Sequence, residues 1–403
     1  MIVYIAYPTS LNLQSANALQ TFTTLRELRA RRPDTLALIP RWGNEPSRFF
    51  EVGAVHLPRP AIGKLSRLYK STLLYYLEHS AFAAMTATVV ALRRHNVQAV
   101  YIRQPIIAAW WAGVFGPRFD LPVIYEAHDL ESRNPSRAKE PWARGFLDLI
   151  DRTALCRSSA VVSLTDNFRR LLAQIEWRDP AEVAVIPDAY DEQVFRPQDR
   201  AACRRGLGLP ADAPIVAYAG MTFAHRWLDG LLSAIRRLRA IHPTLIGIVI
   251  GGRPGERAAL AAHALSEGLR VAETTAMSAD LYLLPLRPQI EVVSCLGAAN
   301  VLVIPDTVTD VTASPLKLFE YMALGLPIVL PAIPALYEIL PSHLAYSFTR
   351  RDLNGLQAAL TAALAECDPA LATERQRLAA EHTYGRRAER IIALVEQVAQ
   401  RKL

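Results

Sequence analysis

The chain has 403 residues, of which 51% are hydrophobic and 21% charged, a composition that excludes a disordered or fibrous protein and a length that fits two domains. No apolar run approaches the roughly 18 residues of a membrane-spanning helix. The four cysteines lie far apart in sequence, so neither a disulfide framework nor a zinc knuckle is expected. These features predict a globular protein of the reducing cytoplasm.

The net charge of the chain is +7, and residues 1–200 carry +5 of it, with 25 Lys and Arg against 20 Asp and Glu. A basic chain favours anionic partners such as nucleic acid, an acidic membrane surface or a phosphorylated ligand. No zinc finger, recognition helix or aromatic-rich RNA motif accompanies the charge, so nucleic acid is disfavoured.

Short apolar runs alternate with amphipathic stretches along the whole chain. The apolar runs predict strands at 2–6, 36–40, 99–102, 123–125, 160–164, 183–186, 215–218, 245–250, 301–304 and 328–330. The amphipathic stretches predict helices at 16–31, 68–94, 142–156, 166–175, 227–242, 316–323 and 353–367. Strands that alternate with helices are typical of parallel sheets covered on both faces, and this length favours two doubly wound domains.

A polar, irregular segment at 191–210 separates the two halves of the chain. We therefore expect a first domain at 1–190 and a second at 191–383. A basic amphipathic helix at 384–403 is expected to return to the first domain. Ligands of doubly wound domains bind at the carboxyl ends of the strands.

The segment 306–331 is the most informative part of the sequence. Pro315 can be the first residue of a helix with Ser314 as its N-cap, and the helix start then offers free amides to an anion. Lys317 in the first turn opposes the helix dipole, which indicates a negative ligand. Glu320 lies near the same face, where a carboxylate can accept two hydrogen bonds from a vicinal diol. Spacing alone leaves open a capped surface helix with a Lys–Glu pair.

Residues 314–329 read Ser-Pro-Leu-Lys-Leu-Phe-Glu-Tyr-Met-Ala-Leu-Gly-Leu-Pro-Ile-Val and resemble the donor-binding signature of the family 4 retaining glycosyltransferases. Further segments resemble landmarks of that family, in the family's order: 101–103, 125–129, 186–197, 218–226 and 250–256. The resemblance covers essentially the whole chain. It implies an α/β protein of the GT-B fold, in which two Rossmann-like domains face each other across a cleft, the first binding the acceptor and the second the nucleotide sugar.

The resemblance implies catalytic roles for three residues. Arg226 and Lys317 would neutralise the diphosphate leaving group, and His128 would reach the donor sugar near the reacting carbon. From the residues alone, His128 is equally an ordinary histidine at a strand end, and Arg226 an ordinary surface residue beside Trp227. No metal ligands and no cofactor are implied, apart from the nucleotide-diphosphate sugar itself.

The resemblance also implies a set of donor-binding residues. Glu320 would hold the ribose hydroxyls, and the amides of Leu316 and Lys317 would contact the diphosphate, because Pro315 has no amide hydrogen. The remaining donor positions implied by the signature are Gly220, Thr312, Ser314 and Pro315. Asn17, in the loop that opens the first helix, would line the acceptor side, although a simple N-cap region accounts for it as well.

Two departures from the family pattern bear on activity. Thr312 stands where the family often has a glutamate that contacts the donor sugar, and Met221 stands where an arginine is usual. The identity of the sugar is therefore open. A nucleotide-sugar epimerase and a catalytically silent partner subunit remain alternatives to a transferase.

The acceptor side shows a basic, aromatic helical stretch at 64–94 and the pair Trp110 and Trp111. Such a helix can lie in a membrane interface or pack in the core with basic ends. The resemblance and the basic first half together predict a metal-independent retaining glycosyltransferase. It would move a sugar to a lipid-linked or saccharide acceptor in cell-surface polysaccharide or glycolipid synthesis, peripheral to the inner face of the cytoplasmic membrane.

Overall fold

The computed structural model describes residues 1–8, 10–13, 15–41, 47–59, 72–133, 141–307 and 314–401. The chain divides into two compact units. Unit 1 comprises Met1–Pro187 with Tyr384–Leu403, and unit 2 comprises Asp188–Thr383. The boundary thus lies three residues before the expected one, and the last helix belongs to unit 1.

Unit 1 contains a seven-stranded, wholly parallel sheet in the order β3-β2-β1-β4-β5-β6-β7. Its strands are β1 (Ile2–Ile5), β2 (Leu36–Pro40), β3 (Val55–Leu57), β4 (Ala99–Ile102), β5 (Val123–Ala127), β6 (Ala160–Ser163) and β7 (Val183–Val185). Chain order reverses between β1 and β4, so the carboxyl ends of these two strands form the crevice of this sheet.

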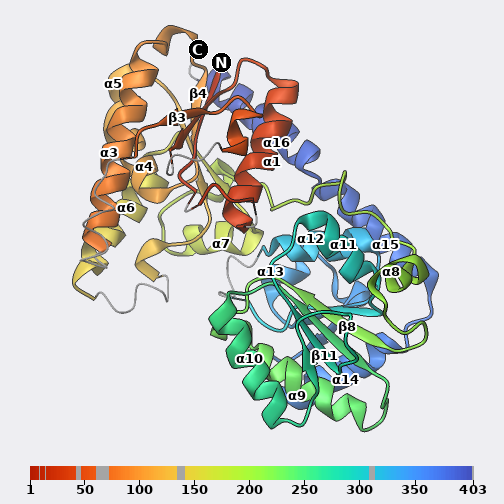
Figure 1. The fold of residues 1–403 in the computed structure, drawn as a ribbon. Coiled ribbons are helices and arrows are strands. Elements are labelled where there is room, and N and C mark those ends of the chain that lie inside the picture. The colour runs from red at the N-terminus through yellow and green to blue at the C-terminus, as the bar shows by residue number, and fades with distance from the viewer. Residues whose placement is uncertain are drawn as a thin grey trace. The chain divides into compact units, whose positions relative to one another are not determined.

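The helices of unit 1 lie on both sides of its sheet (Figure 1). They are α1 (Ala16–Arg31), α3 (Thr72–Ala91), α4 (Pro105–Trp110), a π-helical turn (Trp111–Phe115), α5 (Gly116–Phe119), α6 (Arg144–Arg157), α7 (Asp166–Gln174) and α16 (Tyr384–Gln400). Leu25 and Leu28 of α1 share one apolar core with Ile391 and Val395 of α16. Helices α3, α4 and α6 lie together on the other side (Figure 1).

Unit 2 contains a second seven-stranded parallel sheet, in the order β10-β11-β9-β8-β12-β13-β14. Its strands are β8 (Ile215–Ala219), β9 (Ile246–Ile250), β10 (Val271–Ala272), β11 (Leu281–Leu284), β12 (Val301–Val303), β13 (Ile328–Pro331) and β14 (Tyr346–Phe348). Its helices are α8 (Arg200–Leu207), α9 (Leu228–Arg239), α10 (Pro254–Ser266), α11 (Gln289–Gly297), α12 (Leu316–Leu324), α13 (Pro334–Tyr337), α14 (Leu353–Leu364) and α15 (Pro369–Ala379).

Alternate residues of the unit 2 strands pack on opposite faces of the sheet. Val249 shares a core with Leu231 of α9, whereas its neighbour Ile248 shares one with Leu296 of α11 and Phe319 of α12. Chain order reverses between β8 and β12, so the crevice of this sheet lies at their carboxyl ends. The two parallel sheets, each covered by helices, confirm the predicted α/β fold with two Rossmann-like domains.

Candidate active site

Gly220 follows β8 at the crevice of the unit 2 sheet. Its φ of +142° lies in the region that favours glycine, and its amide donates to the carbonyl of Ile250 at 2.8 Å. A Cβ atom at this position would lie only 2.6 Å from Nζ of Lys317. The absent side chain therefore allows the lysine to lie directly against the backbone after β8.

Lys317 is the second residue of α12 and contacts Tyr218 at the end of β8. Its Nζ donates to the Tyr218 hydroxyl at 2.9 Å and lies 4.0 Å from the centroid of the same ring. Burial, together with the charge of Arg226, holds the pKa of Lys317 well below its usual range, and the charge of Glu320 only partly opposes this. Lys317 therefore forms no surface pair with Glu320, and its alternative interpretation as half of such a pair is wrong.

Arg226 is the second cation at this crevice. Its Nη1 donates to the carbonyl of Asp306 at 3.4 Å, and its Nε is buried without a hydrogen-bond partner. Among the residues that the structure describes, neither Arg226 nor Lys317 forms an ion pair. Partly buried cations without a carboxylate partner are costly, so this part of unit 2 is suited to an anionic ligand.

The start of α12 differs in one detail from the sequence prediction. Pro315 has extended backbone angles (φ −73°, ψ 126°) and is itself the N-cap, so the helix begins at Leu316. Ser314 therefore does not cap the helix; its hydroxyl accepts instead from the amide of Asp188 at 3.2 Å. The amides of Leu316 and Lys317 have no acceptor within the helix, as expected for its first turn. These two amides therefore add two hydrogen-bond donors to the positive charges of Lys317 and Arg226.

Glu320 lies one turn further along α12 and receives a hydrogen bond from the side chain of Gln289, the first residue of α11. Burial raises the pKa of Glu320 to about 7, although the charge of Lys317 and this hydrogen bond lower it. The carboxyl group is thus held in place on the same helix as the free amides.

Asp306 was not singled out by the sequence pattern, yet it organises the loop after β12. Its buried carboxylate accepts from Arg350 Nε at 2.5 Å and from Arg351 Nε at 3.0 Å. Its backbone carbonyl accepts from Arg226. The signal in the sequence was a single acidic residue directly after a buried strand. Thr312, further along this loop, lies outside the described residues.

His128 directly follows β5 in unit 1. Its Nε2 lies 2.8 Å from Oε1 of Glu126 and 3.1 Å from Nη2 of Arg103. Glu126 accepts and Arg103 donates, so these two contacts orient the imidazole ring through Nε2.

Glu126 is the centre of a buried network in unit 1. It accepts from Arg103 Nε at 3.0 Å, from Arg387 of α16 at 2.7 Å and from the hydroxyl of Tyr101. Burial alone would raise the pKa of Glu126, but Arg387 and Arg103, with His128, hold it well below its usual range. The carboxylate therefore stays ionised and fixes the histidine ring.

Asn17 lies in the first turn of α1, and its Oδ1 is buried without a hydrogen-bond partner. Thr21 of the same helix accepts from Nη1 of Arg103 at 2.6 Å and donates to the Asn17 carbonyl at 2.8 Å. The helix that carries Asn17 and the residue His128 thus both contact Arg103. The predicted site residues fall into two groups, these two in unit 1 and all other described ones in unit 2.

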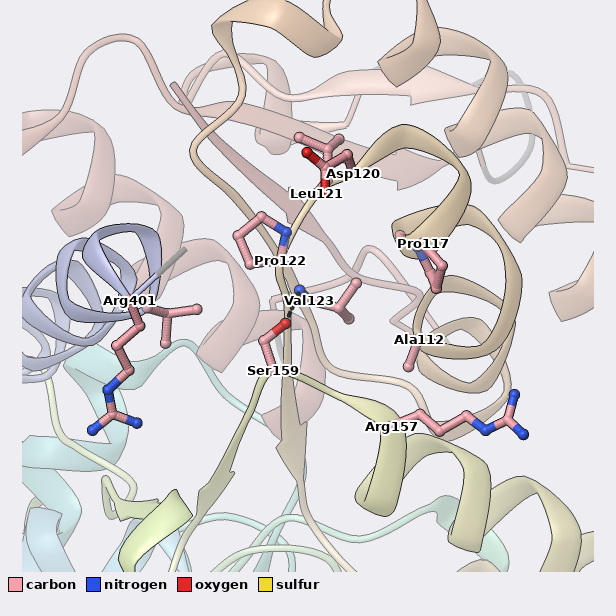
Figure 2. A pocket seen from close by; sticks show the side chains of 11 residues that line it. Ala112, Pro117, Asp120, Leu121, Pro122, Val123, Arg157, Ser159 and Arg401 are labelled. Atoms are coloured by element: carbon pink, nitrogen blue, oxygen red, sulfur yellow. Dashed lines mark hydrogen bonds between the residues drawn. The ribbon is translucent and has the colours of Figure 1, made fainter. Parts of the chain in front are cut away.

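A separate pocket of about 350 Å³ lies at the opposite end of β5 from His128 (Figure 2). Val123, the first residue of β5, and Ser159 form part of its wall, and the Val123 amide donates to the Ser159 hydroxyl at 3.1 Å. Arg157 and Arg401 approach from α6 and from the end of α16 (Figure 2). This pocket belongs to neither group of predicted site residues.

The described ranges of the chain contain no cluster of three or more His, Cys, Asp or Glu side chains suited to a metal ion. They also contain no helix with the length and apolarity required to span a bilayer.

Comparison with known proteins identifies both halves of the chain. Residues 19–189 match the glycosyl transferase 4-like domain, and residues 213–366 match the glycosyl transferases group 1. A D-inositol 3-phosphate glycosyltransferase of Stackebrandtia nassauensis is 34% identical over 157 residues, which cover 38% of this chain and 35% of that protein. The matched part spans between about a third and a half of the length of the curated relatives.

Solved structures share the whole fold at low sequence identity. Sucrose-phosphate synthase from Thermosynechococcus elongatus superposes with a TM-score of 0.71 at 18% identity, covering 99% of both chains. Anabaena HepE in complex with UDP superposes with a TM-score of 0.72 at 14% identity, covering 98% of this chain and 99% of that one. With both domains matched in order on this fold, the chain belongs to the glycosyltransferases of the GT-B fold, as the family 4 resemblance predicted.

Proposed function

We propose that the chain is a retaining glycosyltransferase that moves a sugar from a nucleotide-diphosphate sugar to a lipid-linked or saccharide acceptor in cell-surface polysaccharide or glycolipid synthesis. The observation that carries the proposal is the pair of cations Lys317 and Arg226, which form no ion pair with any described residue, beside the first-turn amides of α12. A diphosphate supplies the negative charge that this arrangement lacks.

The same groups suit the departure of a nucleoside diphosphate. Negative charge develops on the diphosphate as the bond to the sugar breaks, and fixed cations and amides stabilise that charge without reorganisation. In this proposal Glu320 accepts hydrogen bonds from two ribose hydroxyls. The low pKa of Lys317 would rise toward its ordinary value once the diphosphate is bound. The UDP named with HepE is one such ligand.

The acceptor is proposed to bind unit 1 with Asn17 as a contact, whereas His128 is proposed to reach the donor sugar. At this edge Arg103 and Arg387 share the one carboxylate of Glu126, and Arg59 pairs with the buried Glu78. Arg41, which directly follows β2, is exposed and forms no ion pair with a described residue. The edge therefore suits an acceptor that offers hydroxyl groups together with negative charge, as an acidic saccharide or a phosphorylated glycolipid does.

A panel of nucleotide sugars with and without a bacterial lipid extract tests the proposal. Release of nucleoside diphosphate that depends on the extract, and that persists in EDTA, is expected. Conversion of the sugar without acceptor would instead identify an epimerase, and absence of binding to every nucleotide sugar would identify a silent subunit. Replacing Lys317 by Ala should abolish release, whereas the exposed Glu374→Ala should not change it.

A further inference from the structure

Unit 1 exposes large apolar side chains on the layer formed by α3, α4 and α6 (Figure 1). Six side chains, here called the apolar face, belong to this layer: Leu77, Trp110, Val114, Trp142, Phe146 and Leu149. Trp142 is 67% exposed. Isolated exposed apolar residues are ordinary, but a set that includes two tryptophans on one helix layer indicates an interaction surface.

Helix α6 and the residue before its first turn show the pattern most clearly. Trp142, Phe146 and Leu149 are exposed at helical spacing, whereas Leu147 and Ile150 are buried. A helix on a protein surface normally presents polar residues to water. Here Arg144, Asp148 and Arg152 share the outer side with these three apolar residues, so that side combines charge with exposed apolar surface.

The exposed aromatic side chains are held in place by neighbouring helices. The ring of Phe146 lies edge-on to Tyr76 of α3, with centroids 5.4 Å apart. The indole Nε1 of Trp110 donates to the hydroxyl of Ser80, also on α3, at 2.8 Å. The polar atom of this tryptophan is thus satisfied within the protein while its ring remains 42% exposed.

The same layer carries exposed arginines without acidic partners. Arg118 of α5 and Arg144, Arg152 and Arg157 of α6 are all exposed, and none forms an ion pair with a residue that the structure describes. Their charges therefore remain available to an anionic partner.

Some other exposed arginines of unit 1 are neutralised. Arg31 of α1 pairs with Glu27 at 2.8 Å, and Arg48 pairs with Glu51 at 3.0 Å. Others, such as Arg41 after β2 and Arg93 after α3, are exposed and form no ion pair with a described residue. The four arginines beside the apolar face are therefore one part of the free positive charge among the described residues of unit 1.

We propose that the apolar face and its four arginines bind unit 1 to an anionic lipid bilayer. Trp, Phe and Leu side chains partition into the boundary between headgroups and acyl chains, and arginines pair with lipid phosphates. Among the described residues, the four exposed arginines on this layer outnumber its exposed acidic residues Asp120 and Asp148, so its net charge is positive and favours an anionic lipid layer over a second copy of this chain. The proposal goes beyond sugar transfer, and its test needs neither donor nor acceptor.

Flotation of the full chain with vesicles tests the apolar side chains. The protein should float with equimolar phosphatidylcholine and phosphatidylglycerol, and much less with phosphatidylcholine alone. The triple variant Trp142→Ser, Phe146→Ser and Leu149→Ser should lower the partition coefficient at least about ten-fold, because apolar area is no longer buried. The matched control Ile241→Ser with Leu265→Ser, two exposed apolar residues of unit 2, should float like the wild type.

The arginines are tested separately. Arg144→Ser with Arg152→Ser and Arg157→Ser should weaken binding on the order of 100-fold at low salt, and much less at high salt. The control Arg200→Ser with Arg205→Ser removes two exposed arginines of α8 and should leave binding unchanged.

Three outcomes would overturn the proposal: no flotation of the wild type, equal binding to neutral vesicles, or wild-type binding by the apolar triple variant. Sedimentation velocity adds a fourth, since a wild-type dimer that the triple variant converts to a monomer, without vesicle binding, would make this a self-association surface. The conservative Trp142→Phe should still float but show a smaller blue shift of tryptophan emission on vesicles. An unchanged circular dichroism spectrum and thermal unfolding midpoint verify that each variant is folded.

Discussion

Lys317 lies with its Nζ 2.9 Å from the hydroxyl of Tyr218 and 4.0 Å above the same ring. A phenol and an aromatic face orient the cation but do not neutralise it. In an ordinary surface ion pair a carboxylate would neutralise the lysine, and the site would then attract an anionic ligand less strongly. The contact with Tyr218 therefore keeps the lysine in place and leaves its charge for the ligand.

The first prediction concerns Gly220. A Cβ atom in Gly220→Ala would collide with Nζ of Lys317, and φ of +142° is unfavourable for alanine. We expect a loss of stability of about 2 kcal/mol and a roughly ten-fold or larger loss of nucleoside diphosphate affinity, because a charge-assisted contact is displaced. Chemical denaturation and calorimetric titration measure the two effects.

Gly208 provides the matched control. It also has a positive φ, of +68°, but a Cβ atom there meets nothing within 4 Å. Gly208→Ala should lose about 1 kcal/mol of stability and bind nucleotide normally. Equal nucleotide affinity in the two variants would remove the role assigned to the close approach of Gly220 and Lys317.

The second prediction concerns the pH dependence of nucleotide binding. Burial raises the pKa of Glu320 to about 7, so this carboxyl is protonated below that pH and loses its capacity as a double acceptor. Affinity should therefore rise from about pH 6 to about pH 8, approaching tenfold per pH unit on the acid side if only the carboxylate binds ribose. The low pKa of Lys317 acts in the opposite direction, because the lysine loses its charge as the pH rises.

Glu320→Gln separates the two groups. This variant cannot ionise at position 320, so it should bind more weakly at pH 8 and retain only the decline caused by Lys317. A 2′-deoxynucleotide, which lacks one ribose hydroxyl, should show a smaller loss on the same substitution. If the nucleotide affinity of Glu320→Gln still falls as the pH is lowered from about 8 to about 6, another group is responsible for the titration.

The fold was predictable in outline because the buried parallel strands read as continuous apolar runs. The four short strands β3, β10, β11 and β14 were not predicted. β10 has only two residues, and β3 and β14 are edge strands of three residues whose partly exposed side chains interrupt the apolar pattern. β11 has four buried apolar residues like its neighbours, so its signal was present and was missed.

The candidate site was predictable only where one segment carries it. Lys317 and Glu320 stand in a single recognisable helix, whereas Asp306, Arg350 and Tyr218 meet through tertiary packing that sequence separation hides. The capping error at Ser314 has a similar cause, since the hydroxyl bonds a residue far away along the chain. The roles of His128 and Asn17 toward sugar and acceptor stay predictions.

The third prediction concerns Asp306. Asp306→Asn leaves Arg350 and Arg351 without their carboxylate and loosens the carbonyl that holds Arg226. Both arginines remain partly solvated, so we expect a loss of about 2 kcal/mol, below the full cost of breaking a buried ion pair. Nucleotide affinity should also fall, whereas the exposed cap Asp179→Asn in unit 1 should change neither quantity markedly.

Reduced stability with unchanged nucleotide affinity would show that Asp306 supports the loop without orienting Arg226. The double variant Asp306→Asn with Arg226→Ala gives the stricter test. If the carbonyl of Asp306 acts through Arg226, the two substitutions should be less than additive in the free energy of nucleotide binding. Full additivity would show that Asp306 and Arg226 affect nucleotide binding independently.

The fourth prediction concerns Glu126, the carboxylate that joins α16 to the sheet of unit 1. Glu126→Gln leaves the buried guanidiniums of Arg103 and Arg387 uncompensated, which should cost about 3–5 kcal/mol in denaturant unfolding. Glu182→Gln removes the half-exposed carboxylate of the pair with Arg178 and leaves that guanidinium bonded to the Ser158 carbonyl, so it should cost only about 1 kcal/mol. Glu126→Gln also removes the carboxylate that holds the ring of His128. At a temperature where this variant is folded, turnover should therefore fall more than the loss of folded protein explains. Turnover that matches the folded fraction would limit Glu126 to holding α16 on the sheet.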